Sequence, residues 1–181
     1  MTEDQKLKQS HGKSAIERLF FKTNGPGYFN KSESEISNRK FRGIALHQIL
    51  SQIIQFTDID AQINSAVFEG LISRTEGTEL KKHITQSLEK EIVRNWFDGT
   101  GKVLNEADIL LMNGKSKRPD RVVVWDNKVH VIDYKSGTDR DKPGHDLQVR
   151  QYVDLLKQMK YPVVKGFIWY LDKNEVLEID K

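Results

Sequence analysis

The spacing of apolar residues changes along the chain from a helical period to a strand period. Between residues 43 and 97 they recur every three or four positions, which is typical of one face of a helix. Beyond residue 102 they alternate with polar residues, which indicates strands. The predicted helices span 43–56, a segment from Ile59 to Leu71 that Asp58 caps, and 78–97.

The second half of the chain adds strands and one more helix. The predicted strands lie at 103–112, 121–125, 128–132, 163–171 and 176–179, and a helix capped by Asp146 runs to residue 160. The first three strands follow one another through short turns and form a meander. This order predicts an α/β fold with a helical N-terminal part and a mixed central β-sheet flanked by helices.

The first forty residues lack a sustained period. They are polar, contain the turn signal Gly25-Pro26-Gly27, and have apolar spacing for at most one short helix at 16–21. We therefore expect an irregular N-terminal arm or linker over residues 1–40 and a single domain over residues 41–181.

A two-stranded hairpin is predicted between two aspartates, Asp120 and Asp133. Asp126-Asn127 tolerates the positive φ that a two-residue loop needs, and the flanking strands are rich in valine. With that loop Trp125 faces Lys128, and counting outward places Asp120 opposite Asp133. Opposed Cβ atoms in an antiparallel pair lie about 4.5 to 5.5 Å apart, so two negative charges there are destabilising unless a cation offsets them.

The same register gives the hairpin one apolar face. Valines at 122, 124, 129 and 131 fall opposite one another, as expected of a strand pair that packs on a core. Lys135 follows Asp133 by two positions and shares its face. Two carboxylates and an ammonium are therefore predicted to converge, and an exposed turn with a simple Asp-Lys ion pair is the alternative.

Composition limits the chemistry. The chain has 181 residues, of which 37% are hydrophobic and 30% charged, as in one globular domain. It has no cysteine, which excludes disulfides, thiolate zinc sites, iron–sulfur clusters and a cysteine nucleophile. Any metal must bind oxygen or imidazole. No run approaches the roughly 18 apolar residues of a membrane span and the N-terminus has no apolar signal core, so we expect a cytoplasmic protein without membrane association.

The chain is mildly basic, with a formal net charge of +3 and a pI near 8.9. This permits a nucleic-acid partner without establishing one. Positive residues gather around the predicted hairpin, where they form either a solvated rim or a phosphate-binding surface. They are Lys115, Lys117, Arg118, Arg121, Lys128, Lys135, Arg140, Lys142 and Arg150.

The two aspartates of the hairpin suit a hard divalent cation. Mg²⁺ prefers oxygen ligands and is usually held by one or two carboxylates, with water and substrate phosphate in the remaining positions. Asp120 and Asp133 meet that demand. A neighbouring ammonium such as that of Lys135 can orient an attacking water or stabilise negative charge that develops on a phosphate.

Several strings of residues, in this order and spacing, resemble one nuclease family. Pro119-Asp120 followed by Asp133-Tyr134-Lys135 resembles the PD-(D/E)xK phosphodiesterase motif in its strand context. The run from Arg42 to His47 resembles the Gly-x-x-x-His helix of the RecB and AddA nuclease domains, and Ile132 to Gly137 resembles their Asp-Tyr-Lys-(Thr/Ser)-Gly core. Gln148 to Tyr152 is similar to the Gln-x-x-x-Tyr helix that follows in the same proteins.

This resemblance implies a restriction-endonuclease-like core and a set of site residues. It implies that His47, Asp120, Asp133 and the backbone carbonyl of Tyr134 bind the metal. It also makes Lys135 the catalytic lysine beside the two catalytic aspartates. By spacing alone, His47 shares a face with apolar residues, so a core histidine is the alternative.

A second set of residues is expected to contact the substrate or to support the metal ligands. Gln148 and Tyr152 lie four apart on one helical face, near the active centre or the DNA by the resemblance, and a buried amide with a packing tyrosine is the alternative. Glu106 resembles a glutamate common in these domains and is either a neighbour of the ligands or structural. The full set is Gln148, Tyr152, Arg118, Arg121, Arg150 and Glu106.

The resemblance implies a Mg²⁺- or Mn²⁺-dependent DNA exonuclease of DNA-end processing and recombinational repair, without an iron–sulfur cluster. Relatives usually end a long helicase chain, and no ATP-binding Gly-x-x-x-x-Gly-Lys loop is present here. The expected partners are therefore DNA and a RecB-, AddA- or UvrD-like helicase, whether the chain is an excised domain or a separate subunit. The rival interpretations are a catalytically silent module that binds DNA or docks a helicase, and a metal phosphohydrolase that acts on nucleotides.

Overall fold

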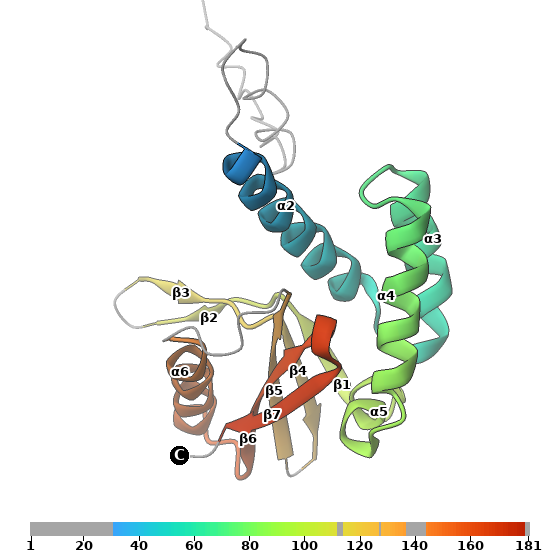
Figure 1. Cartoon of the computed structure of the whole chain (residues 1–181). Coiled ribbons are helices and arrows are strands. Elements are labelled where there is room, and N and C mark those ends of the chain that lie inside the picture. Colours follow the sequence, from blue (N-terminus) through green and yellow to red (C-terminus); the bar gives the residue numbers. More distant parts are fainter. Residues whose placement is uncertain (1–30, 112–113, 127, 137–143, 180–181) are drawn as a thin grey trace, which may run out of the picture. The chain divides into compact units, whose positions relative to one another are not determined.

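The computed structural model describes residues 31–111, 114–126, 128–136 and 144–179, and within these ranges five strands form one mixed sheet in the order β1-β4-β5-β6-β7 (Figure 1). β1 (Lys102–Asn105), β4 (Arg121–Trp125) and β5 (Lys128–Lys135) are paired antiparallel, as the predicted meander requires. β5 runs parallel to β6 (Val164–Tyr170), which pairs antiparallel with β7 (Glu175–Ile179). The predicted α/β architecture with a mixed sheet is confirmed.

The hairpin of β4 and β5 has the predicted register. Its ladder runs from the pair Arg121–Ile132 to the pair Trp125–Lys128. Valines 122, 129 and 131 are buried on one face of the sheet, with Val124 packed against them, while Val123 is buried on the other face. Because both faces of these strands are covered, the residues between the polar ends are nearly all apolar.

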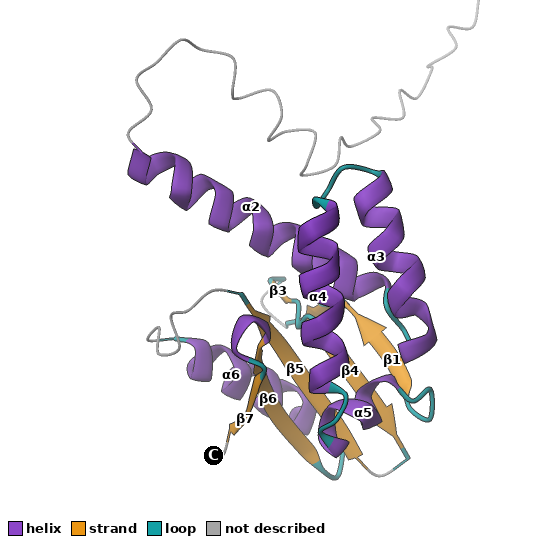
Figure 2. Ribbon diagram, turned by 45° about the vertical axis from the view of Figure 1, so that its right-hand side comes forward, coloured by secondary structure: helices purple, strands orange, loops and turns teal. Residues whose placement is uncertain are grey.

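The helices that precede the sheet in the chain cover one of its faces. They are α2 (Lys31–Gln52), α3 (Ile59–Phe68), α4 (Arg74–Ser87) and α5 (Glu91–Phe97). Figure 2 shows α4 and α5 in front of the strands. Their apolar stripes meet Phe167 and Trp169 of β6 in one continuous core. Contacts divide the chain into two units, Met1–Glu35 and Ile36–Lys181, and the contacts described here belong to the second.

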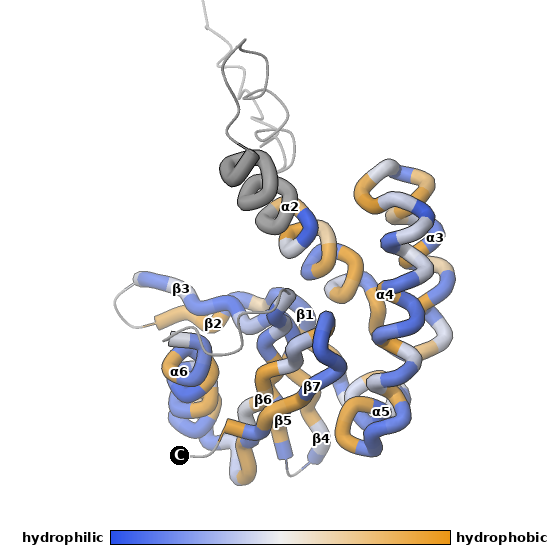
Figure 3. The backbone as a smooth tube through the Cα atoms, in the orientation of Figure 1, coloured by the Kyte–Doolittle hydropathy of each residue, from blue (hydrophilic) through white to orange (hydrophobic). Residues whose placement is uncertain are grey.

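The opposite face of the sheet is covered by α6 (His145–Gln158), which connects the parallel strands β5 and β6. Apolar residues are concentrated on β5 and β6 between the two helical layers (Figure 3). Gly166 on β6 allows α6 to approach closely, since a Cβ at this position would lie 2.5 Å from Val149 Cγ1 and 2.8 Å from Val153 Cγ2. The missing side chain is therefore part of the packing between helix and sheet.

Both ends of α2 differ from the predicted positions. The helix begins at Lys31 rather than at residue 43, and the prediction missed its first turns because they are polar and have no apolar period. It ends at Gln52 rather than at residue 56, since the Asp58 carboxylate accepts hydrogen bonds from the N–H groups of Ile54 and Gln55 at 3.1 and 3.0 Å. Asp58 therefore turns back toward the preceding loop, and its predicted role as the side-chain cap of α3 is wrong.

Other predicted boundaries also need correction. The helix expected at 78–97 is interrupted between α4 and α5, where Ser87 Oγ and Lys90 Nζ bind the side chain of Asn174 at 2.6 and 2.7 Å. The residue that precedes α6 is Gly144, so Asp146 lies in the first turn and does not cap the helix. Neither the hydrogen bonds to Asn174 nor a glycine before a helix changes the spacing of apolar residues, so apolar spacing could not predict these two boundaries.

The strand expected at 103–112 is also broken. Glu106 has a φ of 46°, which ends β1, and a separate two-stranded arm follows, formed by β2 (Ile109–Leu110) and β3 (Ser116–Lys117). The arm is inserted between strands that pair directly, because Asn105 of β1 is the register partner of Arg121. The β2–β3 arm is thus an insertion between β1 and β4, and the chain returns to the sheet at Asp120.

The expected short helix at 16–21 lies outside the described residues. Since α2 crosses residue 40, the domain boundary at 41 stays a prediction. In the part of the chain described, no helix is both long enough and apolar enough to cross a membrane.

Replacing Gly166 with alanine should loosen the contact between α6 and the sheet. The added methyl group overlaps Val149 and Val153, so we expect the free energy of unfolding to fall by about 1 to 3 kcal/mol, as overpacking usually costs. Urea unfolding measures the change. Lys165→Ala, at the exposed neighbouring position, is the control and should change stability by less than about 0.5 kcal/mol. Equal stability of the Gly166→Ala and unsubstituted proteins would contradict the packing argument.

Candidate metal centre

Two predicted ligands meet at one end of the sheet. His47 of α2 and Asp120, which directly precedes β4, lie with Nδ1 and Oδ1 3.1 Å apart, and their side chains are 30% and 17% exposed. The second carboxylate oxygen of Asp120 accepts the backbone N–H of Tyr134 at 2.7 Å. The Asp120 carbonyl accepts the N–H of Glu106 at 3.0 Å, which closes the base of the β2–β3 arm. Helix, hairpin and arm are thus joined at this aspartate.

A close approach of α2 to the end of β5 brings His47 to this position. Gly43 lies one helical turn before His47, and a Cβ on it would come within 3.0 Å of Ser136 Oγ. Glycine at this position leaves room for the residue that follows Lys135. The spacing of Gly43 and His47 therefore has a packing basis.

Asp133 and Lys135 form the buried part of the site. Asp133 is 1% exposed, and Lys135 Nζ lies 2.5 Å from its Oδ2 as an ion pair without the alignment of a hydrogen bond. Burial and the negative charge of Asp120 raise the pKa of Asp133 to about 6, although Lys135 and His47 act in the opposite direction. The buried carboxyl group therefore carries a net electrostatic cost when it is ionised.

The imidazole of His47 responds to the same carboxylates. Burial alone lowers the pKa of His47, but the hydrogen bond and charge of Asp120, together with the charge of Asp133, outweigh burial and hold the pKa above its ordinary value. The site thus attracts positive charge at His47 while it resists ionisation at Asp133. The shift at His47, and the part of the shift at Asp133 that comes from Asp120, reflect negative charge that a cation would offset, whereas burial is the largest cause of the shift at Asp133.

A chain of hydrogen bonds connects Lys135 with the loop before Asp120. Lys135 Nζ donates to Gln148 Oε1 at 3.2 Å, Gln148 Nε2 donates to the Tyr152 hydroxyl at 2.8 Å, and that hydroxyl donates to the Arg118 carbonyl at 3.1 Å. Gln148 and Tyr152 thus lie beside Lys135, which agrees with their predicted place near the active centre. Their geometry favours support of Lys135 and of the loop that ends at Asp120.

The backbone of Tyr134 is oriented toward Asp120. In an antiparallel ladder the N–H and C=O groups of one residue point to the same neighbouring strand. Since the Tyr134 N–H reaches Asp120 Oδ2, its carbonyl points to the same side, beyond the last ladder pair Arg121–Ile132. This orientation is compatible with the predicted ligand role of the carbonyl.

The donors present are compatible with a hard divalent cation. His47 Nδ1 and Asp120 Oδ1 lie 3.1 Å apart and share a hydrogen bond, so an imidazole nitrogen and a carboxylate oxygen that could bind the cation are already neighbours. Among the described residues, however, no three His, Asp or Glu side chains converge closely enough to form a complete ligand set. Asp133 acts electrostatically on both His47 and Asp120 and is the third predicted donor.

Arg121 is not where a DNA contact would need to be. Its side chain is completely buried, with 0% exposure, and binds backbone carbonyls, so the prediction that it contacts phosphate is wrong. It shares the face of Ile132, which packs against the helices that precede the sheet, and not the face of Asp133. In sequence, a buried arginine within a basic run looks the same as an exposed one.

The other predicted contacts have different surroundings. Arg118 is exposed and its guanidinium pairs with Glu106 and Asp108 at 3.8 and 3.5 Å. Glu106 is thereby placed in the arm as a partner of Arg118. Arg150 lies half-buried on α6, and Arg140 and Lys142 lie outside the described residues. The DNA contacts of Arg118 and Arg150 stay predictions.

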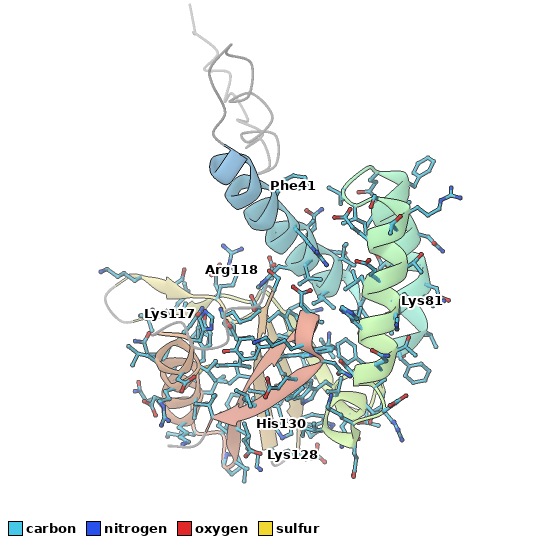
Figure 4. The ribbon with its side chains drawn as sticks, viewed as in Figure 1. Phe41, Lys81, Lys117, Arg118, Lys128 and His130 are labelled. Carbon is cyan, nitrogen blue, oxygen red and sulfur yellow. The ribbon has the colours of Figure 1, made fainter. Side chains whose placement is uncertain are left out.

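The basic residues around the hairpin do not form one rim. Figure 4 shows Lys117 and Arg118 at one end of the sheet and Lys128 at the other. Lys135 lies seven positions after Lys128 on β5, a distance of about 23 Å along a strand. Lys128 instead lies over the ring of Trp125, 4.7 Å from its centroid. It does not belong to the site.

Comparisons with known proteins identify the superfamily and agree with the fold. The family model of the PD-(D/E)XK nuclease superfamily matches residues 17–179, and the mixed sheet between helices agrees with the predicted restriction-endonuclease-like fold. Among solved structures, the crystal structure of SSO0001 is similar, with 19% identity over 85% of this chain and 80% of that chain and a TM-score of 0.34, which is too low to support an inference. The comparison with curated proteins gives no match.

Replacing Asp133 with asparagine should stabilise the metal-free protein near neutral pH. The raised pKa of Asp133 means that its stabilising contribution is complete below its ordinary value of 3.8 and is lost as the pH rises through about 6. Asparagine resembles the protonated form, so we expect the variant to unfold at a higher temperature at pH 7 to 8 and the difference to shrink toward pH 4. Thermal unfolding in a chelator measures this, with Asp126→Asn in the exposed turn as the control. A difference that does not depend on pH would contradict the assignment.

Removing the Tyr152 hydroxyl should weaken the support of Lys135. Tyr152→Phe breaks the bonds to Gln148 and to the Arg118 carbonyl, and we expect kcat for nucleic-acid hydrolysis to fall about tenfold while the fold is retained. Tyr161→Phe is the same chemical change outside this hydrogen-bond chain and should leave kcat unchanged. Steady-state kinetics and circular dichroism decide the outcome, and unchanged kcat in Tyr152→Phe would refute the supporting role.

Proposed function

The chain belongs to the PD-(D/E)XK nuclease superfamily, and we propose that it is an active, metal-dependent deoxyribonuclease whose centre is built from His47, Asp120, Asp133 and Lys135. The proposal is carried by one observation. The imidazole of α2 and the aspartate before β4 lie 3.1 Å apart beside a buried aspartate with its own lysine. A shared cation explains why the fold holds these like charges together.

The chain's own residues have distinct parts in the proposed hydrolysis. His47, Asp120, Asp133 and the Tyr134 carbonyl would hold Mg²⁺ or Mn²⁺, which when bound lowers the pKa of water and offsets phosphate charge. Lys135 is held between Asp133 and Gln148, so its ammonium is available to orient the attacking water or to stabilise the developing charge on phosphate. Gln148 and Tyr152 keep that ammonium in place.

DNA is the proposed substrate, and an exonuclease of DNA-end processing and recombinational repair is the proposed role. Support comes from the resemblance of Asp133-Tyr134-Lys135 and its neighbours to RecB and AddA nuclease domains. The exposed Arg118 and Lys115 lie in or beside the β2–β3 arm that returns to Asp120, where they can follow a phosphate backbone. A helicase domain or subunit that feeds the strand is the proposed partner.

A catalytically silent module that binds DNA or docks a helicase is the rival. It shares the fold but has no need for a buried carboxylate whose pKa is raised to about 6. Such a group is unfavourable for folding, and its retention together with Lys135 and His47 favours an active centre.

Nucleotide release from DNA tests the proposal. With Mg²⁺ or Mn²⁺ the protein should release acid-soluble nucleotides from single- or double-stranded DNA, and Asp133→Ala should lower the rate about a hundredfold or more, since it removes a charge that acts on the transition state. Asp126→Ala, in the exposed turn, is the control and should keep full activity. DNA binding should weaken steeply as salt rises.

The alternatives give different results in the same assay. Activity that survives Asp133→Ala or a chelator would refute the proposed centre. Binding of DNA without cleavage under any metal supports the silent module. Hydrolysis of mononucleotides in preference to polymer supports a nucleotide phosphohydrolase.

A further inference from the structure

Arg121 is a buried cation held by the ends of two helices. Its Nη1 donates to the Ile53 carbonyl at 2.7 Å, and its Nη2 donates to the carbonyls of Ile54 and Trp96 at 2.7 and 2.6 Å. The guanidinium also lies over the ring of Phe97, 3.9 Å from the centroid. Carbonyl groups at helix C-termini carry partial negative charge, so they offset the charge of the arginine. One side chain on β4 thus binds α5 and the segment that ends α2.

The neighbouring strand reinforces this attachment. Asn105 of β1 is the register partner of Arg121, and its Nδ2 donates to the Ser51 carbonyl at 2.6 Å. Asn105 Oδ1 also lies 3.5 Å from Arg121 Nη1. Asn105 of β1 therefore binds a carbonyl in the last turn of α2, and Arg121 of β4 binds the carbonyls of the two residues that follow the helix.

This attachment lies between the two groups that must meet at the metal. Asp120 directly precedes Arg121, and His47 precedes Ile53 by six residues, or about 9 Å along a helix. The helix itself ends at Gln52, five residues after His47, and its last turn is attached through the Ser51 carbonyl, so a shift of this end is transmitted along the helix to His47. Tyr134 is a further neighbour of Arg121. Its hydroxyl interacts with the guanidinium, and its backbone N–H binds Asp120.

We infer that Arg121 is a positioning residue, which sets the spacing between His47 and Asp120 by fixing the end of α2 against β4. The inference rests on the proposed function, because the spacing matters only if both groups bind one cation. Metal ligation tolerates little displacement, and the loss of a residue that orients ligands typically lowers metal affinity or activity by 10- to 100-fold. Arg121 itself touches neither the metal nor DNA.

Arg121→Lys tests this role, because lysine keeps the charge but lacks the planar fork that binds carbonyls of two segments. We expect the dissociation constant for Mn²⁺, measured by calorimetry on the folded metal-free protein, to rise about tenfold or more. We also expect kcat to fall while KM for DNA stays unchanged, since the side chain is buried. Asn105→Ala removes the attachment at Ser51 and the long contact with Arg121 Nη1 but leaves the bonds of Arg121 to the three carbonyls, so it should raise the Mn²⁺ dissociation constant by a smaller factor.

A control of equal stability separates positioning from a general loss of stability. Ile84 is a fully buried apolar residue of α4 that is neither a proposed metal ligand nor a hydrogen-bond partner of Arg121, so Ile84→Ala or Ile84→Val, chosen to match the unfolding temperature of Arg121→Lys, should keep the original Mn²⁺ affinity. Unchanged Mn²⁺ affinity in Arg121→Lys, or equal loss in the matched control, overturns the inference.

Failure to fold or to bind metal also decides the question. If Arg121→Lys does not fold, unchanged affinity in Asn105→Ala overturns the inference and weakened affinity supports it. If the unsubstituted protein binds no Mn²⁺, the proposed function fails and this role fails with it. If the unsubstituted protein and Arg121→Lys bind Mn²⁺ equally well, only the positioning role is refuted and the proposed function stands.

Discussion

The opposition of two aspartates across one hairpin is the constraint around which the site is arranged. The last pair of the β4–β5 ladder is Arg121 with Ile132, and Asp120 and Asp133 are the next residues of the two chain segments; Asp133 is 1% exposed, and the negative charge of Asp120 helps to raise its pKa. Like charges in such a pair are unfavourable, and every neighbour acts to reduce the cost. His47 binds one carboxylate, Lys135 pairs with the other, and the Tyr134 N–H donates to the first. These contacts therefore offset part of the repulsion between the two carboxylates, and a divalent cation would offset more of it.

Elements from both faces of the sheet contribute to this arrangement. α2 belongs to the helices that pack on one face and brings His47 to Asp120, whereas α6 packs on the other face and brings Gln148 to Lys135. Both meet at the end where β4 begins and β5 ends, beyond the last backbone pair of the ladder. Side chains there are no longer confined to one face, so groups from two layers can reach the same carboxylates. The position of the site follows from where the hairpin stops pairing.

The sequence predicts the parts of this design that depend on a regular period. A two-residue loop and an alternating run of valines determine the register of β4 and β5, so the ladder from Arg121–Ile132 to Trp125–Lys128 could be inferred without coordinates. Tertiary polar contacts have no such period. The break between α4 and α5 depends on Asn174, far along the chain, and the burial of Arg121 depends on the carbonyls of two helices. The sequence does not tell whether a polar side chain faces solvent or a helix end, so it does not show that Arg121 is buried and cannot contact DNA.

The separation of Arg121 from the aspartates is itself part of how the site works. Arg121 is the chain neighbour of Asp120, and a buried arginine beside a buried carboxylate ordinarily forms an ion pair. Strand alternation prevents this, because Arg121 points to the face of Ile132 and Asp133 points to the other. The arginine is satisfied by neutral carbonyls and the ring of Phe97, so its charge does not neutralise the carboxylates. A direct pair would lower the negative charge available to a cation. In the proposed metal centre this separation would leave the carboxylates free to bind a cation, while Arg121, on the other face, would fix the segment that follows the helix supplying the histidine.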